Sequence, residues 1–452
     1  MSRSRPSDAF LSAWRLMGAT LAAGILASAL VVGQSATSAT PVTPASSPGA
    51  AAPATPATRL GFSVARLARI DALLQQYVDE GRIGGAVGLV LRDGVVAYER
   101  AVGWSDKEAG RRMTPDALFR IASQTKALTS VSIMSLVEEG RIGLGDPVSR
   151  FIPAYAKTTV MTKVETGTTA VPAKRPITIR DLLTHTAGIS YGTDASVAKQ
   201  YEAAGLGPAA GYGWYTADKT EGICDTMERL ATLPFVAQPG EEWVYGYNTD
   251  ILGCVVEKVA GVSLDAYIRT HITSPLGMKD TFFYVPPEKR QRLTAVYASG
   301  ADGKAVRAPD GARGQGHYVD GPRRSYAGGA GLVSTARDYA TFLEMLRRGG
   351  ALGATRILAP RTVAAMTTNH VGTLHSPDGL GFGLGFETTD RFGANGLSSQ
   401  GAFGWGGAYG SVYRVDPKDR LVIVFMIQLL PNATDIRDRF PTMVYQALVD
   451  AK

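Results

Sequence analysis

Residues Phe119-Arg-Ile-Ala-Ser-Gln-Thr-Lys126 open an apolar segment that continues to Gly140 and from which the fold can be predicted. Apolar residues occur all around this segment, so Ala122 to Gly140 is predicted to be a buried helix. Ser123 then lies in the first turn, and Lys126 shares its face. A desolvated lysine can take the proton that makes a serine hydroxyl nucleophilic. A capping serine followed by a solvated lysine is the commoner origin of this spacing, so the pair needs further support.

The segments on either side of this helix predict a mixed fold. Helices are predicted at Phe62–Arg82, Thr178–His185, Asp250–Ala260, Ala336–Arg348 and Asp435–Val449, and strands at Gly85–Arg92, Val95–Val102, Gly381–Thr388, Gly410–Asp416 and Leu421–Gln428. Asp93-Gly94 is a strong hairpin turn between the first two strands. Strands therefore lie at both ends of the chain and helices in the middle, which indicates an α+β class in which the chain ends share one sheet.

The N-terminal region has the composition of an export signal. Three arginines precede an apolar stretch, Leu16 to Val32, and small residues follow near position 39. We predict a signal peptide at 1–39, a Pro/Ala/Thr-rich linker at 40–58 and one domain at 59–450, with a helical insert at about 135–325. The protein is then periplasmic or secreted. An uncleaved segment that anchors the chain in the membrane is the alternative.

Charge and cysteine content exclude several classes of function. The formal net charge is +7, without a run of Lys or Arg that could follow a phosphate backbone, so we expect no nucleic-acid partner. Cys224 and Cys254 have no metal-binding spacing, and no metal or other cofactor is expected. The two cysteines could form a disulfide or remain buried thiols, because sequence does not give the distance between them.

Two further motifs contain residues suited to acyl transfer. The first is Trp243-Val-Tyr245-Gly-Tyr247-Asn248-Thr-Asp250, in which a phenol could relay a proton. The second is Gly404-Trp405-Gly406-Gly407-Ala408-Tyr409-Gly410, in which small residues allow backbone N–H groups to approach a reacting carbonyl. A core aromatic cluster and a glycine-rich turn are the plain alternatives.

Five strings in this order extend the pattern over residues 62–450. They are Phe119 to Lys126, Leu182-Leu-Thr-His-Thr-Ala-Gly188, Pro239-Gly-Glu-Glu-Trp-Val-Tyr245, Ala327-Gly-Gly-Ala-Gly-Leu-Val-Ser-Thr335 and Trp405-Gly-Gly407. With them the chain resembles the serine β-lactamase and penicillin-binding-protein superfamily, and most of all its β-lactamase-like carboxylesterases. The resemblance implies an antiparallel sheet formed from both chain ends, flanked by helices, with a mostly helical inserted domain.

The resemblance also implies roles for individual residues. Ser123 would be the acylated nucleophile, Lys126 its base or proton partner, and Tyr245 the second proton-transfer residue. Backbone N–H groups of Ser123 and Ala408 would form the oxyanion hole. Substrate would contact Trp405, Gly406, Gly407 and Asp250, with no metal in the site.

The sequence departs from the superfamily pattern in two places. Many members have Tyr-x-Asn, whereas Asn248 stands three residues after Tyr245. The spacing from Tyr245 to Asp250 resembles the esterase variant instead, and Tyr247 remains a rival for the tyrosine role. Trp405 stands where β-lactamases and peptidases usually have Lys or His, a cation that can help hold a carboxylate. This change favours neutral esters.

A second serine motif, Gly188-Ile-Ser190-Tyr-Gly192, matches the G-x-S-x-G nucleophile elbow. That elbow needs a preceding strand and a following helix, whereas a short helix precedes Ser190 and a glycine-rich loop follows it. Ser190 is therefore not expected to be the nucleophile. His185, in the same region, is expected to bond the backbone as a structural histidine.

The sequence predicts an exported serine hydrolase that cleaves small acyl esters through an acyl-enzyme on Ser123. A β-lactamase, a D-alanyl-D-alanine carboxypeptidase-like enzyme and an acyltransferase remain alternatives, as does an inactive binding protein with the same fold. The expected partner is a small-molecule ester or amide substrate.

Overall fold

The computed structural model describes residues 58, 60–165, 167–207 and 217–450 of the chain. The predicted signal peptide (1–39) and almost all of the predicted linker (40–58) lie outside the described residues. The helices are α3 (Val64–Asp79), α4 (Thr125–Glu138), α5 (Ile179–Leu183), α6 (Ala198–Ala203), α8 (Ile223–Leu230), α9 (Asn248–Ala260), α10 (Leu264–Ile268), α11 (Ala336–Arg347), α12 (Pro360–Met366) and α13 (Ile436–Ala447). Short helical turns are η1 (Ala122–Gln124), η2 (Val148–Arg150), η3 (Pro153–Lys157), η4 (Arg269–Thr273) and η5 (Pro287–Arg292).

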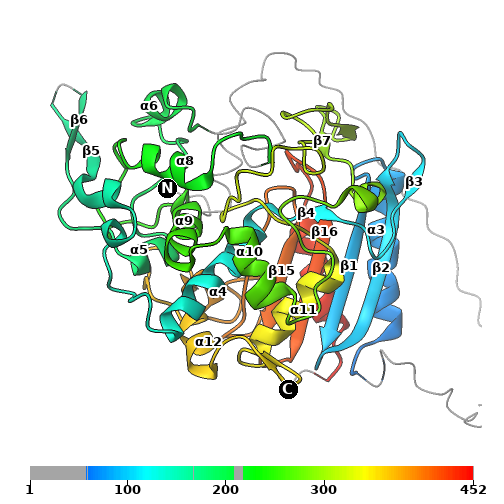
Figure 1. Cartoon of the computed structure of the whole chain (residues 1–452). Helices are drawn as coiled ribbons and strands as arrows, with labels where there is room; N and C mark the ends of the chain where they lie inside the picture. The colour runs from blue at the N-terminus through cyan, green and yellow to red at the C-terminus, as the bar shows by residue number, and fades with distance from the viewer. Residues whose placement is uncertain (1–57, 59, 166, 208–216, 451–452) are drawn as a thin grey trace, which may run out of the picture. The chain divides into compact units, whose positions relative to one another are not determined.

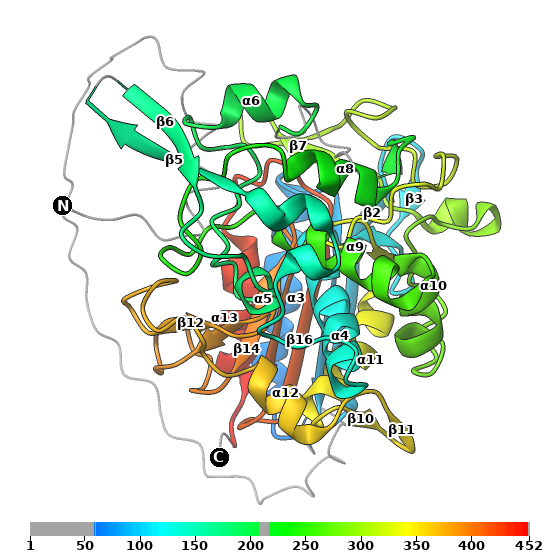
Figure 2. The ribbon, with the colours of Figure 1, turned by 60° about the vertical axis from the view of Figure 1, so that its left-hand side comes forward.

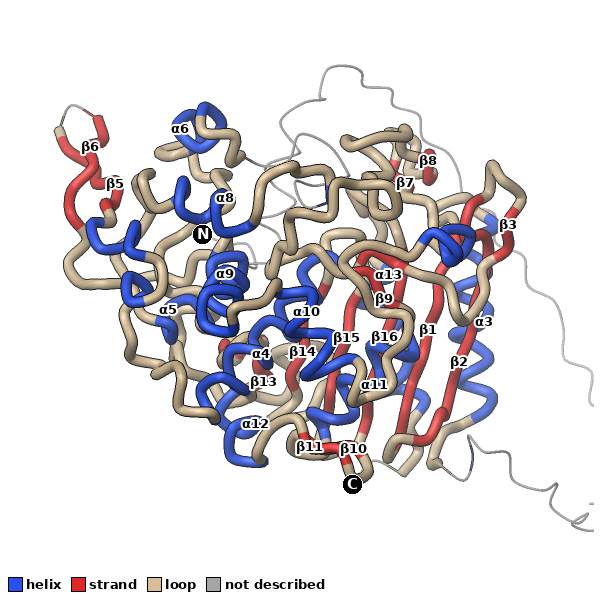
Figure 3. The backbone as a smooth tube through the Cα atoms, in the orientation of Figure 1, coloured by secondary structure: helices blue, strands red, loops and turns tan. Residues whose placement is uncertain are grey.

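One 8-stranded antiparallel sheet forms the framework, in the order β12-β13-β14-β15-β16-β1-β2-β3 (Figures 1 and 3). Its strands are β1 (Gly85–Arg92), β2 (Val95–Asp106), β3 (Arg111–Arg112), β12 (Leu380–Phe382), β13 (Glu387–Thr389), β14 (Phe403–Gly406), β15 (Val412–Asp416) and β16 (Leu421–Ile427). β1 pairs with β16 in an unbroken register from Ala86–Ile427 to Arg92–Leu421. The two ends of the chain therefore share one sheet, and the α+β prediction is confirmed.

Helices cover both faces of this sheet. On β16, Val422, Val424 and Met426 pack into the larger core with α4 and α11, whereas Ile423 and Phe425 pack into a second core with α3 and α13. Figure 2 shows α13 on one side of the strands and α4 and α11 on the other. The continuous apolar run of this strand follows from its burial on both faces.

Local sequence signals account for the helix boundaries. Ser63 caps α3, and its hydroxyl oxygen accepts a hydrogen bond from the backbone N–H of Arg66. Thr178 and Asp181 form a reciprocal capping box at the start of α5. Gly261 ends α9 in the left-handed conformation that glycine adopts without strain. The helices predicted around these positions are confirmed.

The predicted strand Gly381–Thr388 is wrong. The structure has two short strands there, β12 and β13, joined by a tight reversal with Gly385 at φ +101°. The Leu384 N–H bonds the Met366 carbonyl at 2.9 Å, which ties the reversal to α12. The glycine-rich motif also differs from expectation, because Phe403–Gly406 is itself a strand rather than only a turn.

Smaller hairpins that the sequence did not indicate lie outside the main sheet. They are β5 (Thr159–Val164) with β6 (Gly167–Pro172), β7 (Tyr297–Ser299) with β8 (Ala305–Arg307), and β10 (Ala351–Leu352) with β11 (Thr355–Arg356); β4 (Phe119–Arg120) pairs separately with β9 (Val333–Ser334). The β5–β6 hairpin projects from the helical side of the domain in both ribbon views (Figures 1 and 2). Among the described residues, no helix has the length and hydropathy needed to cross a membrane.

The two cysteines form a disulfide. Cys224 and Cys254 lie with their Cα atoms 5.0 Å apart, and the bridge joins α8 to α9. Of the two states left open by the sequence, the structure has the bonded one. The bridge fixes the helix that begins immediately after Tyr247.

Candidate active site

Ser123 and Lys126 lie at a buried junction between the sheet and the helical layer. Ser123 sits on η1, which leads directly into α4, and Lys126 is in the first turn of α4. Lys126 is only 3% exposed, and its Nζ lies 3.4 Å from Ser123 Oγ. The predicted sharing of one helix face therefore brings the amine within reach of the hydroxyl.

Three acceptors surround the Lys126 amine. Besides the Ser123 hydroxyl, Nζ donates to Tyr191 Oη at 2.9 Å and to the Gly329 carbonyl at 2.7 Å. An ammonium group has three donors, so these contacts match its full capacity. Neither Tyr191 nor Gly329 was singled out from the sequence. Tyr191 belongs to the G-x-S-x-G string, which therefore contributes its tyrosine to the site.

Tyr245 lies above the same amine. Its ring centroid is 4.7 Å from Lys126 Nζ, within the range of a cation–π contact. Trp405 Nε1 donates a hydrogen bond to Tyr245 Oη at 3.1 Å. The indole thus occupies an acceptor site on the phenol oxygen and fixes the position of the phenol beside the amine.

Tyr247 lies in a different environment from Tyr245. It is 1% exposed, and its ring packs edge-on against Tyr191 with centroids 4.8 Å apart. Burial raises the pKa of Tyr247, with the Asp250 carboxylate adding to the effect. A phenol whose pKa is raised by burial is a weaker proton donor. Of the two candidate tyrosines, the structure brings Tyr245 to the amine.

A cluster of rings supports Tyr245 from behind. The His185 ring lies 4.8 Å from the Tyr245 ring, and Trp243 stacks on Tyr245 at 5.8 Å between centroids. Asn248 Nδ2 donates to His185 Nδ1 at 2.9 Å, which places the imidazole proton on Nε2. Burial, and then the charge of Lys126, hold the pKa of His185 well below its usual value. His185 is therefore a neutral packing group, and its ring bonds the Asn248 side chain rather than the backbone that the sequence predicted.

The glycine motif approaches the nucleophile from the sheet. Trp405 lies on the face of β14 that packs against the larger core, and Gly407 follows in the turn to β15. A Cβ on Gly407 would lie 2.6 Å from the Ile121 carbonyl oxygen, two residues before Ser123. Only glycine allows this approach. It brings the backbone of the predicted oxyanion residue Ala408 to the start of η1.

Gly406 and Asp250, both predicted to touch substrate, lie in different surroundings. Gly406 lies on β14, and the Arg437 guanidinium occupies the space that a side chain at 406 would fill. Asp250 is fully buried on α9, and its Oδ1 accepts a hydrogen bond from the Gly329 N–H at 3.1 Å. Asp250 therefore supports the chain behind Lys126 and does not face a surface that a substrate could touch.

Ser190 does not have the geometry of a nucleophile elbow. It is buried in a loop after α5, and its hydroxyl accepts a hydrogen bond from the Gly192 N–H at 3.1 Å. The element directly before it is the short helix α5, and the described residues between α5 and Ser190 contain no strand. Among the described residues, no group of three or more His, Cys, Asp or Glu side chains is arranged to hold a metal ion.

Comparison with known proteins shows the family to which this chain belongs. The sequence model of the Beta-lactamase family matches residues 70–447. The chain belongs to the Beta-lactamase family. Esterase EstB of Burkholderia gladioli is 32% identical over 365 residues, covering 77% of this chain and 87% of EstB. A putative D-alanyl-D-alanine carboxypeptidase of Salmonella typhimurium is 27% identical over 398 residues, covering 81% of this chain and 84% of that protein.

A solved structure extends the comparison to three dimensions. EstCE1, described as a hydrolase with promiscuous acyltransferase activity, is 29% identical with a TM-score of 0.71. The match covers 86% of this chain and 100% of EstCE1. This Beta-lactamase family member is therefore a serine hydrolase with the β-lactamase fold, and its relatives include esterases.

Proposed function

We propose that this serine hydrolase cleaves small acyl esters through an acyl-enzyme on Ser123. The observation that carries the proposal is the contact between Ser123 Oγ and Lys126 Nζ at 3.4 Å inside a buried site. The similarity to EstB, an esterase, supports the ester as substrate class. Trp405 supports it further, because an indole offers an apolar wall where related peptidases carry a cation.

The proposed reaction has two halves. In the reactive state the Lys126–Tyr245 pair carries one proton fewer than an ammonium beside a neutral phenol. Ser123 Oγ attacks the ester carbonyl while its proton passes to this pair. The carbonyl oxygen, now negative, lies against the backbone N–H groups of Ser123 and Ala408. The C–O bond breaks, and the alcohol leaves with the proton that the pair returns. Water then adds to the acyl-enzyme and releases the acid and free Ser123.

Tyr245 is the proposed proton donor to the leaving alcohol. Its ring lies 4.7 Å from the Lys126 amine, and its oxygen accepts the Trp405 N–H. The amine can therefore return a proton to the phenol as the phenol gives one away. Trp405 positions the phenol in addition to forming the wall of the site.

Replacing Ser123 with Ala tests the proposal. Hydrolysis of a chromogenic acetyl or butyryl ester is expected to fall to the uncatalysed rate, because no acyl-enzyme can form. Ser190→Ala is the matched control, since Ser190 is a buried serine of the rival motif, and it is expected to keep wild-type turnover. Full activity in Ser123→Ala would end the proposal.

A D-amino-acid peptidase is the second candidate function, and Arg437 favours it. The guanidinium lies against Gly406, and its interactions with the Asp438 and Glu387 carboxylates are electrostatic rather than hydrogen bonds. An arginine in this state can receive the carboxylate of a peptide C-terminus. Measuring D-alanyl-D-alanine peptides and a cephalosporin beside the esters separates the candidates. Faster turnover of peptide than of ester would place the enzyme among the peptidases.

We also propose that the protein works outside the cytoplasm. The disulfide between Cys224 and Cys254 supports this location, because such bonds persist mainly in oxidising compartments. The basic and apolar order of residues 3–32 supports export as well.

A further inference from the structure

A buried acid lies directly behind the catalytic amine. Asp250, in the first turn of α9, is 0% exposed. Its Oδ1 accepts the Gly329 N–H at 3.1 Å, and its Oδ2 has no hydrogen-bond partner among the described residues. Burying a carboxylate with an unsatisfied oxygen costs free energy, so this arrangement does not serve stability.

Gly329 connects this acid to Lys126. The Gly329 N–H binds the carboxylate, and the Gly329 carbonyl accepts from Lys126 Nζ at 2.7 Å. A Cβ at position 329 would collide with Asp250 Oδ2. A glycine is therefore needed for the carboxylate to lie against this backbone. The position of the carboxylate fixes the position of the carbonyl that holds the amine.

Few charged or titratable groups face Asp250. Lys126 from α4 is the main cation, and Lys219, before α8, is a weaker one. The phenols that interact with the carboxylate are Tyr247, at the start of α9, and Tyr155 of η3. Lys219 is already paired with Glu221 at 3.3 Å. The charge of Asp250 therefore acts chiefly on Lys126.

We propose that Asp250 is a positioning residue, whose ionised carboxylate holds Gly329 and the Lys126 amine in the reactive arrangement. The inference rests on the proposed function. An ionised carboxylate binds the Gly329 N–H more strongly than a neutral acid does. It also attracts the ammonium across a poorly screened interior. A neutral Asp250 loosens both contacts, and Lys126 is no longer held beside Ser123.

The proposal has a defined pH dependence. Burial raises the pKa of Asp250 to about 6, against the opposing effect of Lys126 and the Gly329 N–H. The carboxylate is therefore ionised above this value and neutral below it. Activity falls as the pH decreases through about 6 because the neutral acid releases the amine.

Asp250→Asn tests the proposal, since the amide imitates the neutral acid at every pH. We expect kcat/KM for an acetyl ester at pH 7.5 to fall about 10- to 100-fold, mostly in kcat. We also expect the variant to lose the wild-type decline near pH 6. The rate of Ser123 labelling by a fluorophosphonate, measured from pH 4.5 to 8.5, is the second readout and does not depend on the natural substrate.

Glu257→Gln is the matched control. Glu257 is a second, partly buried acid on α9 whose pKa is raised by burial, and its carboxylate accepts a hydrogen bond from the Leu264 N–H at 3.0 Å, outside the site. Its pH profile is expected to superimpose on that of the wild type. The unfolding midpoint of Asp250→Asn at pH 7.5 is expected to equal or exceed the wild-type value, because the variant removes a buried charge.

The outcomes separate this inference from the proposed function. A wild-type protein that neither hydrolyses esters nor labels at Ser123 contradicts the proposed function. An active wild type whose Asp250→Asn variant keeps the full rate, or keeps the decline near pH 6, overturns the role of Asp250. If the Asn variant does not fold, Gly329→Ala displaces the carboxylate while keeping its charge. An unchanged labelling rate in that variant also overturns it.

Discussion

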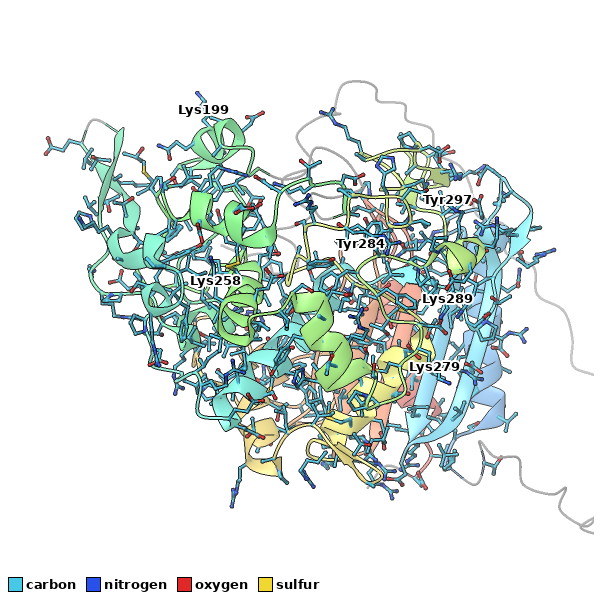
Figure 4. The ribbon with its side chains drawn as sticks, in the orientation of Figure 1. Lys199, Lys258, Lys279, Tyr284, Lys289 and Tyr297 are labelled. Carbon is cyan, nitrogen blue, oxygen red and sulfur yellow. A yellow bond between two sulfur atoms is a disulfide. The ribbon has the colours of Figure 1, made fainter. Side chains whose placement is uncertain are left out.

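Lys126 differs in its burial from the exposed lysines of this protein. Lys199, Lys258 and Lys279 lie on the outer surface (Figure 4). Lys126 is buried, and all its partners are neutral acceptors. Among the described residues, the Lys126 amine therefore faces the Ser123 hydroxyl with no carboxylate bonded directly to it.

The two tyrosines of one loop allow a paired test at this scale. Tyr245→Phe removes the phenol that lies above Lys126, so ester hydrolysis is expected to fall about 10²- to 10⁴-fold in kcat. Tyr247→Phe removes a buried hydroxyl whose pKa is raised by burial, and its kcat is expected to stay within a few-fold of wild type. Steady-state kinetics on both purified variants provide the comparison. A larger loss of kcat in Tyr247→Phe than in Tyr245→Phe would show that Tyr247, and not Tyr245, transfers the proton.

Sequence alone named Ser123, Lys126, Tyr245 and Trp405, and the structure brings these four together. The spacing of Ser123 and Lys126 on one helix is a local feature, so sequence could predict their contact. Tyr191 and Gly329 contact the amine from 65 and 203 residues away. No local pattern encodes such contacts, because they depend on how the loops pack. Asp250 was expected to touch substrate and instead lies behind the amine.

At the scale of elements, prediction succeeded where one pattern fills a whole segment. The apolar run of β16 and the capping signals of α3 and α5 gave the expected elements. The strand predicted at Gly381–Thr388 failed because its glycines allow a reversal that hydrogen bonds to α12 stabilise. Alternating apolar residues do not distinguish one strand from two short strands with a turn between them.

The turn between β14 and β15 carries a prediction of its own. A methyl group in Gly407→Ala would meet the Ile121 carbonyl at 2.6 Å and push the turn away from Ser123. The loss of an aligned oxyanion donor is expected to lower kcat about 10²- to 10³-fold, with a smaller change in KM. Gly145→Ala is the control, because a Cβ at that exposed glycine meets no atom within 4 Å. Steady-state kinetics on an ester check both variants, and an unchanged kcat in Gly407→Ala would contradict the role of this turn.

For the domain as a whole, the site lies where the sheet and the helical layer meet. The sheet built from both chain ends supplies Trp405 and the turn that contains Gly407. The continuous segment of η1 and α4 supplies Ser123 and Lys126, and the helical layer supplies Tyr245. The disulfide between α8 and α9 stabilises that helical layer. The α+β arrangement was predictable because strand patterns sit at both ends of the sequence. The order of the strands and the packing of the layers could not be predicted from the sequence and are known from the structure.

Locating the covalent adduct on the chain tests whether Ser123 is the nucleophile. The full chain is incubated with a fluorophosphonate, digested, and its peptides sequenced by mass spectrometry. We expect one adduct per chain, on the hydroxyl of Ser123, formed at a rate that Tyr245→Phe reduces. An adduct on Ser190, or a chain that stays unmodified while it still hydrolyses esters, would contradict this expectation.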